Sequence, residues 1–171
     1  MRSTSTTAIV AALTFMQAAN SADTLPWNIP AAMRSSVEGV AFEAVLDIGV
    51  WLNPFYLRGD FDGDGVMDYA MLVSRRNDNK KGIAIWLSSA PKSRLIIIGA
   101  GTKSRAGGGE YDDWDFFDAW KVYGKRRVAH GAGEGEPPKL IGEAILIERT
   151  EAASGLLYWD GKGFRWYQQG D

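Results

Sequence analysis

The sequence predicts an all-β protein, mainly antiparallel sheet with a short helix near the N-terminus. Short runs rich in β-branched and aromatic residues recur along the chain, separated by turns rich in Gly, Pro or Asp. The 171 residues include 7 Trp, 6 Tyr and 7 Phe, a density typical of packed sheets. Near the C-terminus the side chains alternate, which places Phe164 and Trp166 on one face of a strand and Arg165 and Tyr167 on the other.

The first 22 residues have the pattern of a secretion signal. Arg2 supplies a positive charge, and the apolar stretch from Ala8 to Met16 is too short to span a bilayer. Small residues such as Ser21 and Ala22 suit a cleavage site. We therefore expect residues 1–22 to be removed. Residues 23–171 should form one β-rich domain, exported to the periplasm or the medium without a membrane anchor.

The N-terminal half of this domain is expected to contain one helix and several strands. A helix is predicted from Pro30 to Arg34, because Pro is favoured in a first turn. The apolar stretch from Val40 to Leu46 fits either a helix or a strand. Residues 99–118 interrupt the strand pattern with flexible glycines. The strands before that interruption are predicted at residues 50–57, 69–73, 83–87 and 94–98.

The C-terminal half gives the clearest β signal. Residues 129–138 are a loop by composition, and Asp160-Gly161-Lys162-Gly163 is a turn. The sequence has no internal repeat, whereas a propeller needs several similar blades. One or two antiparallel sheets are therefore predicted, in a single domain that is not a closed propeller. The strands of this half are predicted at residues 120–123, 144–148, 156–159 and 164–168.

The most specific motif is an acidic loop of nine residues. Alternate carboxylates and a glycine that permits a sharp turn suit a hard cation that takes many oxygens, and the carbonyl of Val66 can add one more. Ca²⁺ is predicted over Mg²⁺, which prefers fewer carboxylates and more water. An Asp/Gly-rich solvated turn without an ion is the alternative. The carboxylates stand at positions 1, 3, 5 and 9 and the glycine at position 6: Asp60, Asp62, Asp64, Asp68 and Gly65.

This loop differs from an EF-hand, because its position 12 is Met71 rather than Glu and its flanks are predicted strands. The segment GDFDGDGVMDYAMLV resembles the D-x-D-x-D-G-x-x-D calcium loop of FG-GAP and VCBS repeats, the blades of integrin-type propellers. The resemblance covers residues 54–74. It implies side-chain ligation of Ca²⁺ by four residues and backbone ligation by a fifth: Asp60, Asp62, Asp64 and Asp68, with Val66 through its carbonyl.

A second acidic run lies among aromatic residues. Two interpretations stay open for it: a second cation or polar-ligand site, and an exposed loop with a short aromatic anchor. The carboxylates are Asp112, Asp113, Asp115 and Asp118, and the aromatic residues are Tyr111, Trp114, Phe116 and Phe117.

No arrangement of residues indicates catalysis, and a non-enzymatic binding or interaction protein is expected. The chain has no Cys, and its one His, His130, lies in a Gly-rich loop. No glycine spacing matches a P-loop or a dinucleotide fingerprint. Without Arg2, the 18 Lys and Arg are outnumbered by 21 Asp and Glu, so the net charge gives no reason to expect nucleic acid or an anionic membrane as partner.

One short stretch suggests a protein partner. Ser154-Gly155-Leu156-Leu157-Tyr158 is similar to the S-G-x-x-Y motif of bacterial periplasmic lysozyme inhibitors, in which the motif sits in a loop that enters the lysozyme cleft. Some exported immunity proteins against peptidoglycan hydrolases look similar and pair this motif with a calcium loop. The resemblance implies Ser154, Gly155 and Tyr158 as partner contacts, although this chain has no disulfide.

Two alternatives to an inhibitor remain for this stretch. In the first, Ser154-Gly155 is a turn at the start of a strand and Tyr158 is a cross-strand partner. In the second, the neighbouring aromatic residues Tyr158, Trp159 and Trp166 stack on sugar rings, which would make the protein a carbohydrate-binding module that contacts a glycan.

Overall fold

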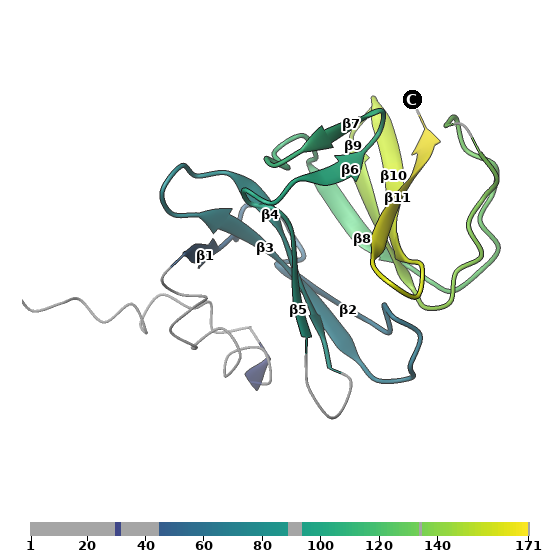
Figure 1. The fold of residues 1–171 in the computed structure, drawn as a ribbon, viewed down its shortest axis with the longest axis horizontal. Coiled ribbons are helices and arrows are strands. Elements are labelled where there is room, and N and C mark those ends of the chain that lie inside the picture. Colours follow the sequence, from purple (N-terminus) through teal and green to yellow (C-terminus); the bar gives the residue numbers. More distant parts are fainter. Residues whose placement is uncertain (1–29, 32–44, 89–93, 134, 171) are drawn as a thin grey trace, which may run out of the picture.

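A computed structural model describes residues 30–31, 45–88, 94–133 and 135–170. This part of the chain forms eleven strands with antiparallel pairing, so the all-β prediction is confirmed (Figure 1). The expected signal at 1–22 lies outside the described residues, as does most of the expected helix at 30–34. No helix among the described residues is long and apolar enough to cross a membrane.

Nine of the strands form two sheets, and the other two form a hairpin. In the first sheet, β1 and β2 both pair with β3, and β4 and β5 follow. In the second sheet the order is β11-β10-β9-β8. The first sheet contains β1 (Leu46–Ile48), β2 (Tyr56–Gly59), β3 (Asp68–Arg75), β4 (Lys81–Leu87) and β5 (Arg94–Gly99). The hairpin is β6 (Ser104–Ala106) and β7 (Gly109–Tyr111), and the second sheet contains β8 (Ala119–Tyr123), β9 (Ala144–Arg149), β10 (Ala153–Trp159) and β11 (Phe164–Gly170).

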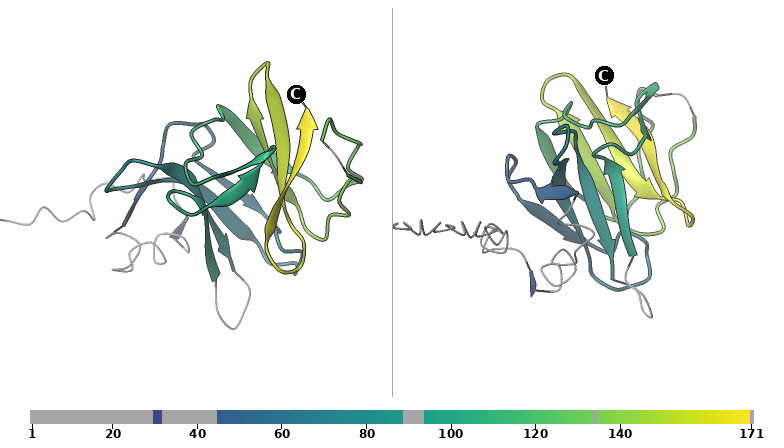
Figure 2. Two further views of the ribbon diagram at one scale, coloured as in Figure 1. Left: turned by 45° about the horizontal axis from the view of Figure 1, so that its top comes forward. Right: turned by 60° about the vertical axis from the view of Figure 1, so that its left-hand side comes forward.

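The main core lies between the two sheets. Leu72 and Ile85 of the first sheet join one cluster with Ile145 and Leu157 of the second, and all four are at most 2 % exposed. Trp114, from the connection before β8, is buried in the same cluster. Because the sheets share this core, they form a single domain. Figure 2 shows the β6–β7 hairpin lying beside the second sheet, next to β11.

Several strands are apolar on both faces because both faces are covered. In β10, Leu157 packs in the main core, whereas Leu156 packs in a second cluster on the outer face of its sheet. The connection between β8 and β9 supplies Val128 and Leu140 to this outer cluster. Double coverage explains why these strands appear in the sequence as nearly continuous apolar runs.

In β11 the predicted alternation is confirmed. Phe164 and Trp166 pack against the main core, whereas Tyr167 is buried in the outer cluster and Arg165 is exposed.

Two sequence predictions about the elements are wrong. The strand predicted at 50–57 begins only at Tyr56, because Pro54 has no N–H to donate to a ladder. The stretch at 99–118, predicted as a flexible interruption, contains the β6–β7 hairpin. Its strands have three residues each and no apolar alternation, and Gly107 takes a φ of 54° in the turn.

Candidate metal centre

The acidic loop connects β2 to β3, two neighbouring strands of the first sheet. Gly63 and Gly65 have φ values of 81° and 86°, a region that L-residues with side chains rarely adopt. A side chain at position 63 would also meet the carbonyl oxygen of Ile141 at 2.3 Å. Glycine at these positions therefore lets the loop turn sharply while it packs against the segment that leads into β9.

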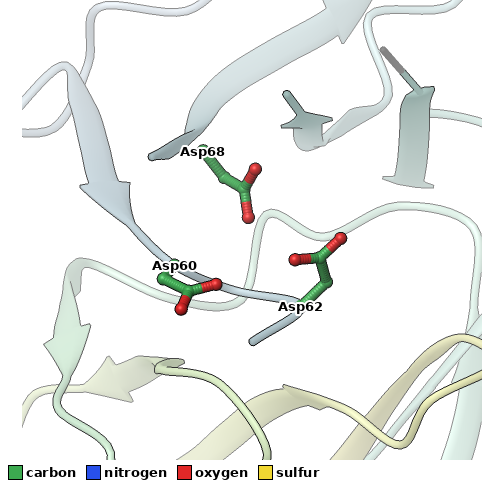
Figure 3. A group of neighbouring side chains, drawn as sticks. All are labelled: Asp60, Asp62 and Asp68. Atoms are coloured by element: carbon green, nitrogen blue, oxygen red, sulfur yellow. The ribbon is translucent and has the colours of Figure 1, made fainter. Parts of the chain in front are cut away.

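Three of the predicted ligands converge in this loop. Carboxylate oxygens of Asp60, Asp62 and Asp68 all lie within 4.8 Å of one another. Figure 3 shows the three side chains turned toward a common space. Among the residues that the structure describes, this is the one group of three or more His, Cys, Asp or Glu side chains with such geometry.

Asp68 is the one completely buried member of this group. Its Oδ2 accepts the N–H of Phe61 at 2.9 Å, and its Oδ1 accepts the N–H of Ser88 at 2.8 Å. Burial is the largest cause that raises the pKa of Asp68 to about 6, and these two hydrogen bonds oppose the shift. Because these hydrogen bonds compensate for burial only in part, a proton or a cation would stabilise the Asp68 carboxylate further.

The other two carboxylates are held by the loop itself. Asp60 accepts the N–H of Gly63 at 2.8 Å through Oδ1 and that of Gly65 at 3.1 Å through Oδ2. Burial raises the pKa of Asp62, and the nearby charges of Asp64 and Asp60 raise it further. The loop is thus folded by hydrogen bonds to its own backbone, and its negative charges stay close together.

The remaining two predicted ligands do not belong to the converging group. Asp64 is exposed, and its Oδ1 accepts the N–H of Val66 at 2.7 Å. Val66 is 43 % exposed. Ligation by Asp64 and by the Val66 carbonyl therefore stays a prediction.

Sequence reasoning missed Glu143, which lies directly before β9. The N–H of Asp60 donates to Glu143 Oε2 at 3.0 Å, and the N–H of Glu143 donates to the Asp60 carbonyl at 2.7 Å. The preceding Gly142 packs so closely that a Cβ there would meet the Asp60 carbonyl oxygen at 2.5 Å. No periodic pattern marks Glu143, because its role arises from a contact across 83 positions.

The side chains present fit a hard divalent cation. Three carboxylates supply the charge and the oxygen ligands that Ca²⁺ takes, and neither Cys nor His belongs to the group. A cation there would also offset the cost of ionising the buried Asp68. When bound, it would cross-link the loop through these carboxylates.

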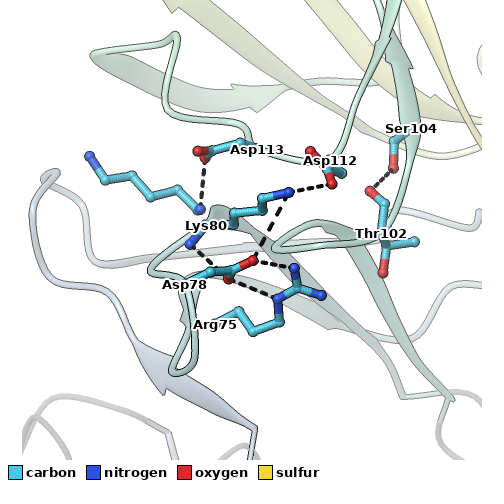
Figure 4. A network of polar contacts seen from close by, with 8 residues as sticks. Arg75, Asp78, Lys80, Thr102, Ser104, Asp112 and Asp113 are labelled. Atoms are coloured by element: carbon cyan, nitrogen blue, oxygen red, sulfur yellow. Dashed lines mark hydrogen bonds and ion pairs between the residues drawn. The ribbon is translucent and has the colours of Figure 1, made fainter.

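The second acidic run has a different arrangement, and Figure 4 shows its first two carboxylates, Asp112 and Asp113. Asp112 pairs with Lys80 Nζ at 2.5 Å, and Asp113 accepts the backbone N–H of Lys81 at 2.9 Å. Farther along, Asp118 accepts both the N–H and the hydroxyl of Thr150. The neighbouring Trp114 and Phe117 are buried in the main core. Three carboxylates of the run thus have partners within the fold, and its aromatic residues anchor the loop in the core, as the second interpretation expects.

The S-G-x-x-Y stretch lies inside β10, between β9 and β11, so the loop placement that the resemblance implies is wrong. Gly155 is buried directly beneath Trp166, whose ring atom Cζ2 would lie 2.0 Å from an added Cβ. Tyr158 is half-buried, and burial raises the pKa of its hydroxyl. Ser154 is half-buried at the edge of a cleft.

That cleft, of about 370 Å³, lies between the β6–β7 hairpin and the second sheet. Tyr111, Phe116 and Trp166 form much of its wall, and Ser154 and Arg149 line it as polar groups. The rings contact one another, with centroids 5.8 Å apart for Tyr111 and Phe116 and 6.4 Å apart for Phe116 and Trp166. Sequence reasoning missed this cleft because it did not predict the hairpin.

Comparison of the chain with models of protein families, with curated proteins and with solved structures found no match.

Proposed function

We propose that the protein is an exported, non-enzymatic β-domain that binds Ca²⁺ in the loop between β2 and β3 and acts as a binding or interaction protein. The observation that carries the calcium proposal is the completely buried carboxylate of Asp68, which faces those of Asp60 and Asp62. Ca²⁺ in this position neutralises charge that the fold otherwise buries at a cost.

The bound ion would stabilise the contact between the two sheets as well as the loop. The loop belongs to the first sheet, and Glu143 holds it against the segment that enters the second. A ligand that binds only the folded state raises stability in proportion to the logarithm of its free concentration. We therefore assign the ion a structural role in a chain that has no disulfide.

Thermal unfolding of residues 23–171 in Ca²⁺, in Mg²⁺ and in chelator tests the calcium proposal. We expect Ca²⁺ to raise the melting temperature with an apparent Kd of about 10⁻⁴–10⁻³ M, the range of extracellular modules. Asp62→Ala should remove this increase, whereas Asp115→Ala, an exposed carboxylate outside the converging group, should keep it. A wild-type melting temperature that is the same in Ca²⁺ and chelator would refute the proposal.

A carbohydrate-binding role is the second candidate, and the cleft beside the hairpin favours it. Sugar rings present apolar faces and hydroxyl groups, and this cleft combines aromatic walls with Ser154, Arg149 and Asp115. Peptidoglycan fragments should change the tryptophan fluorescence of the wild-type protein, and Tyr111→Ala should weaken their binding by about 5-fold. If the fragments bind equally well to both proteins, the cleft is not their site.

The remaining candidate function is inhibition of a peptidoglycan hydrolase. An inhibition assay with a double variant of the same protein distinguishes it from sugar binding. Ser154→Asp with Tyr158→Ala should abolish inhibition of a lysozyme if these residues contact it. Inhibition that survives the double substitution would exclude this surface as the contact.

A further inference from the structure

The connection between β8 and β9 forms a groove of about 770 Å³ on the side of the second sheet that faces away from the main core. We call it the basic groove. Its walls include the rigid pair Pro137 and Pro138. Four of its side chains are cationic: Lys125, Arg126, Arg127 and Lys139.

The basic groove is positively charged, whereas the whole protein has a net charge of −2. Its four Lys and Arg side chains are exposed, and one acidic side chain, Glu136, lines the groove with them. Another acid of this connection, Glu134, lies outside the described residues. No ion pair joins the four cations to a described residue, whereas Lys121 in the adjacent strand pairs with Glu148 at 3.2 Å. The groove is therefore a local positive region that the net charge conceals.

The groove is fixed to the fold rather than carried on a loose tail. Val128 and Leu140 are 3 % and 7 % exposed in the outer cluster of the second sheet. The N–H of Gly131 donates to the hydroxyl of Tyr167 in β11 at 3.0 Å. The guanidinium of Arg126 lies 4.2 Å from the ring centroid of Tyr123, which restricts its direction. Such preorganisation lowers the entropy cost of binding a ligand.

We propose that the basic groove binds a polyanionic polysaccharide. Guanidinium groups bind carboxylate, sulfate and phosphate oxygens in bidentate geometry, and two of the cations are arginines. A concave site with a proline wall admits a linear chain more readily than a flat bilayer. The apolar residues Val128 and Leu140 are buried and cannot insert into lipid.

Single-stranded nucleic acid fits the groove less well. Its recognition relies on bases that stack on aromatic side chains. No Phe, Trp or Tyr is among the described residues that line the groove, and the nearby ring of Tyr123 is covered by Arg126.

Titration of fluorescent heparin and of polygalacturonate into the full mature chain tests this inference, with chelator present so that the result is independent of calcium. Wild type should bind heparin at low salt and lose at least 10-fold in affinity between 50 and 200 mM NaCl, as expected for several ionic contacts. The triple variant Lys125→Gln, Arg126→Gln, Arg127→Gln should lose at least 10-fold at fixed salt. Arg126→Lys, which keeps the charge but not the bidentate geometry, should lose affinity by a smaller factor.

A second triple variant is the matched control. Lys103→Gln, Arg105→Gln and Lys162→Gln remove the same charge from exposed positions outside the groove and should change affinity less than 2-fold. Equal losses in both triple variants would show non-specific attraction and overturn the proposal. Tighter binding to phosphatidylglycerol vesicles or to an oligonucleotide than to either polysaccharide would also overturn it. Circular dichroism of each variant confirms that the fold is retained.

Discussion

Asp60 and Glu143 exchange two hydrogen bonds, from the Asp60 N–H to Glu143 Oε2 and from the Glu143 N–H to the Asp60 carbonyl. The first residue begins the acidic loop of the first sheet, and the second precedes β9 of the second sheet. Through this pair, the loop that holds the converging carboxylates is attached to both halves of the fold. Loss of the Glu143 side chain should therefore affect stability and metal affinity together.

Glu143→Ala removes the acceptor of the Asp60 N–H and should lower the free energy of unfolding by about 1–3 kcal/mol. If the metal proposal holds, affinity for Ca²⁺ should also fall, because Asp60 loses one of its supports. Glu143→Gln keeps an acceptor oxygen and should therefore retain most of the stability and most of the affinity for Ca²⁺. Urea unfolding in chelator and Ca²⁺ titration by calorimetry measure the two quantities. Alanine and glutamine variants that behave alike would contradict this role.

Asp68 should make the metal-free protein less stable as the pH rises. Its folded pKa of about 6 lies above the ordinary value of 3.8, so the native state binds more protons than the unfolded state between these values. The free energy of unfolding should therefore fall between about pH 4 and pH 6, by about 3 kcal/mol at most from this group. Urea unfolding in chelator at several pH values measures this slope.

Asp68→Asn isolates the contribution of this residue. Other carboxylates titrate in the same range, so the informative quantity is the difference in slope between the two proteins. The variant should lack the fall assigned to Asp68, and saturating Ca²⁺ should reverse the loss in wild type at pH 7. Identical slopes for both proteins in chelator would show that Asp68 ionises as freely in the fold as in the unfolded chain.

Local patterns predicted the long strands well, because β3, β4, β9 and β10 contain nearly continuous apolar runs and the side chains of β11 alternate between its two faces. They also predicted the acidic loop, because the spacing of its Asp residues is contained within nine consecutive positions. They failed for the β6–β7 hairpin, whose strands Ser104–Ala106 and Gly109–Tyr111 have no periodic signal. They also missed Glu143, because its role depends on a contact with the distant residue Asp60. They missed the basic groove, because its positive charge is hidden in a net charge of −2 for the whole chain.

Trp114 and Trp120 should respond differently to the same substitution. Both are buried, with exposed fractions of 1 % and 3 %. The Nε1–H of Trp120 donates to the carbonyl of Pro54 at 2.8 Å, whereas Nε1 of Trp114 has no hydrogen-bond partner among the residues that the structure describes. Trp120→Phe should therefore cost about 1 kcal/mol more than Trp114→Phe. Equal costs in chemical denaturation would mean that the bond to Pro54 adds no net stability.

Gly155 should tolerate no side chain, even though glycine usually weakens the interior of a strand. An added Cβ would lie 2.0 Å from Cζ2 of Trp166, and that ring is held by a hydrogen bond from its Nε1 to Gln168 Oε1 at 3.0 Å. Gly155→Ala should therefore lower the free energy of unfolding by about 2 kcal/mol or more and shift the fluorescence of Trp166. Gly163→Ala is the control and should be nearly neutral, because no atom of the described part of the chain lies within 4 Å of its added Cβ. A stable Gly155→Ala variant with unchanged fluorescence would show that the Trp166 ring moves aside freely. The expected result would explain the glycine of the S-G-x-x-Y stretch by packing within the fold, whatever partner Ser154 and Tyr158 contact.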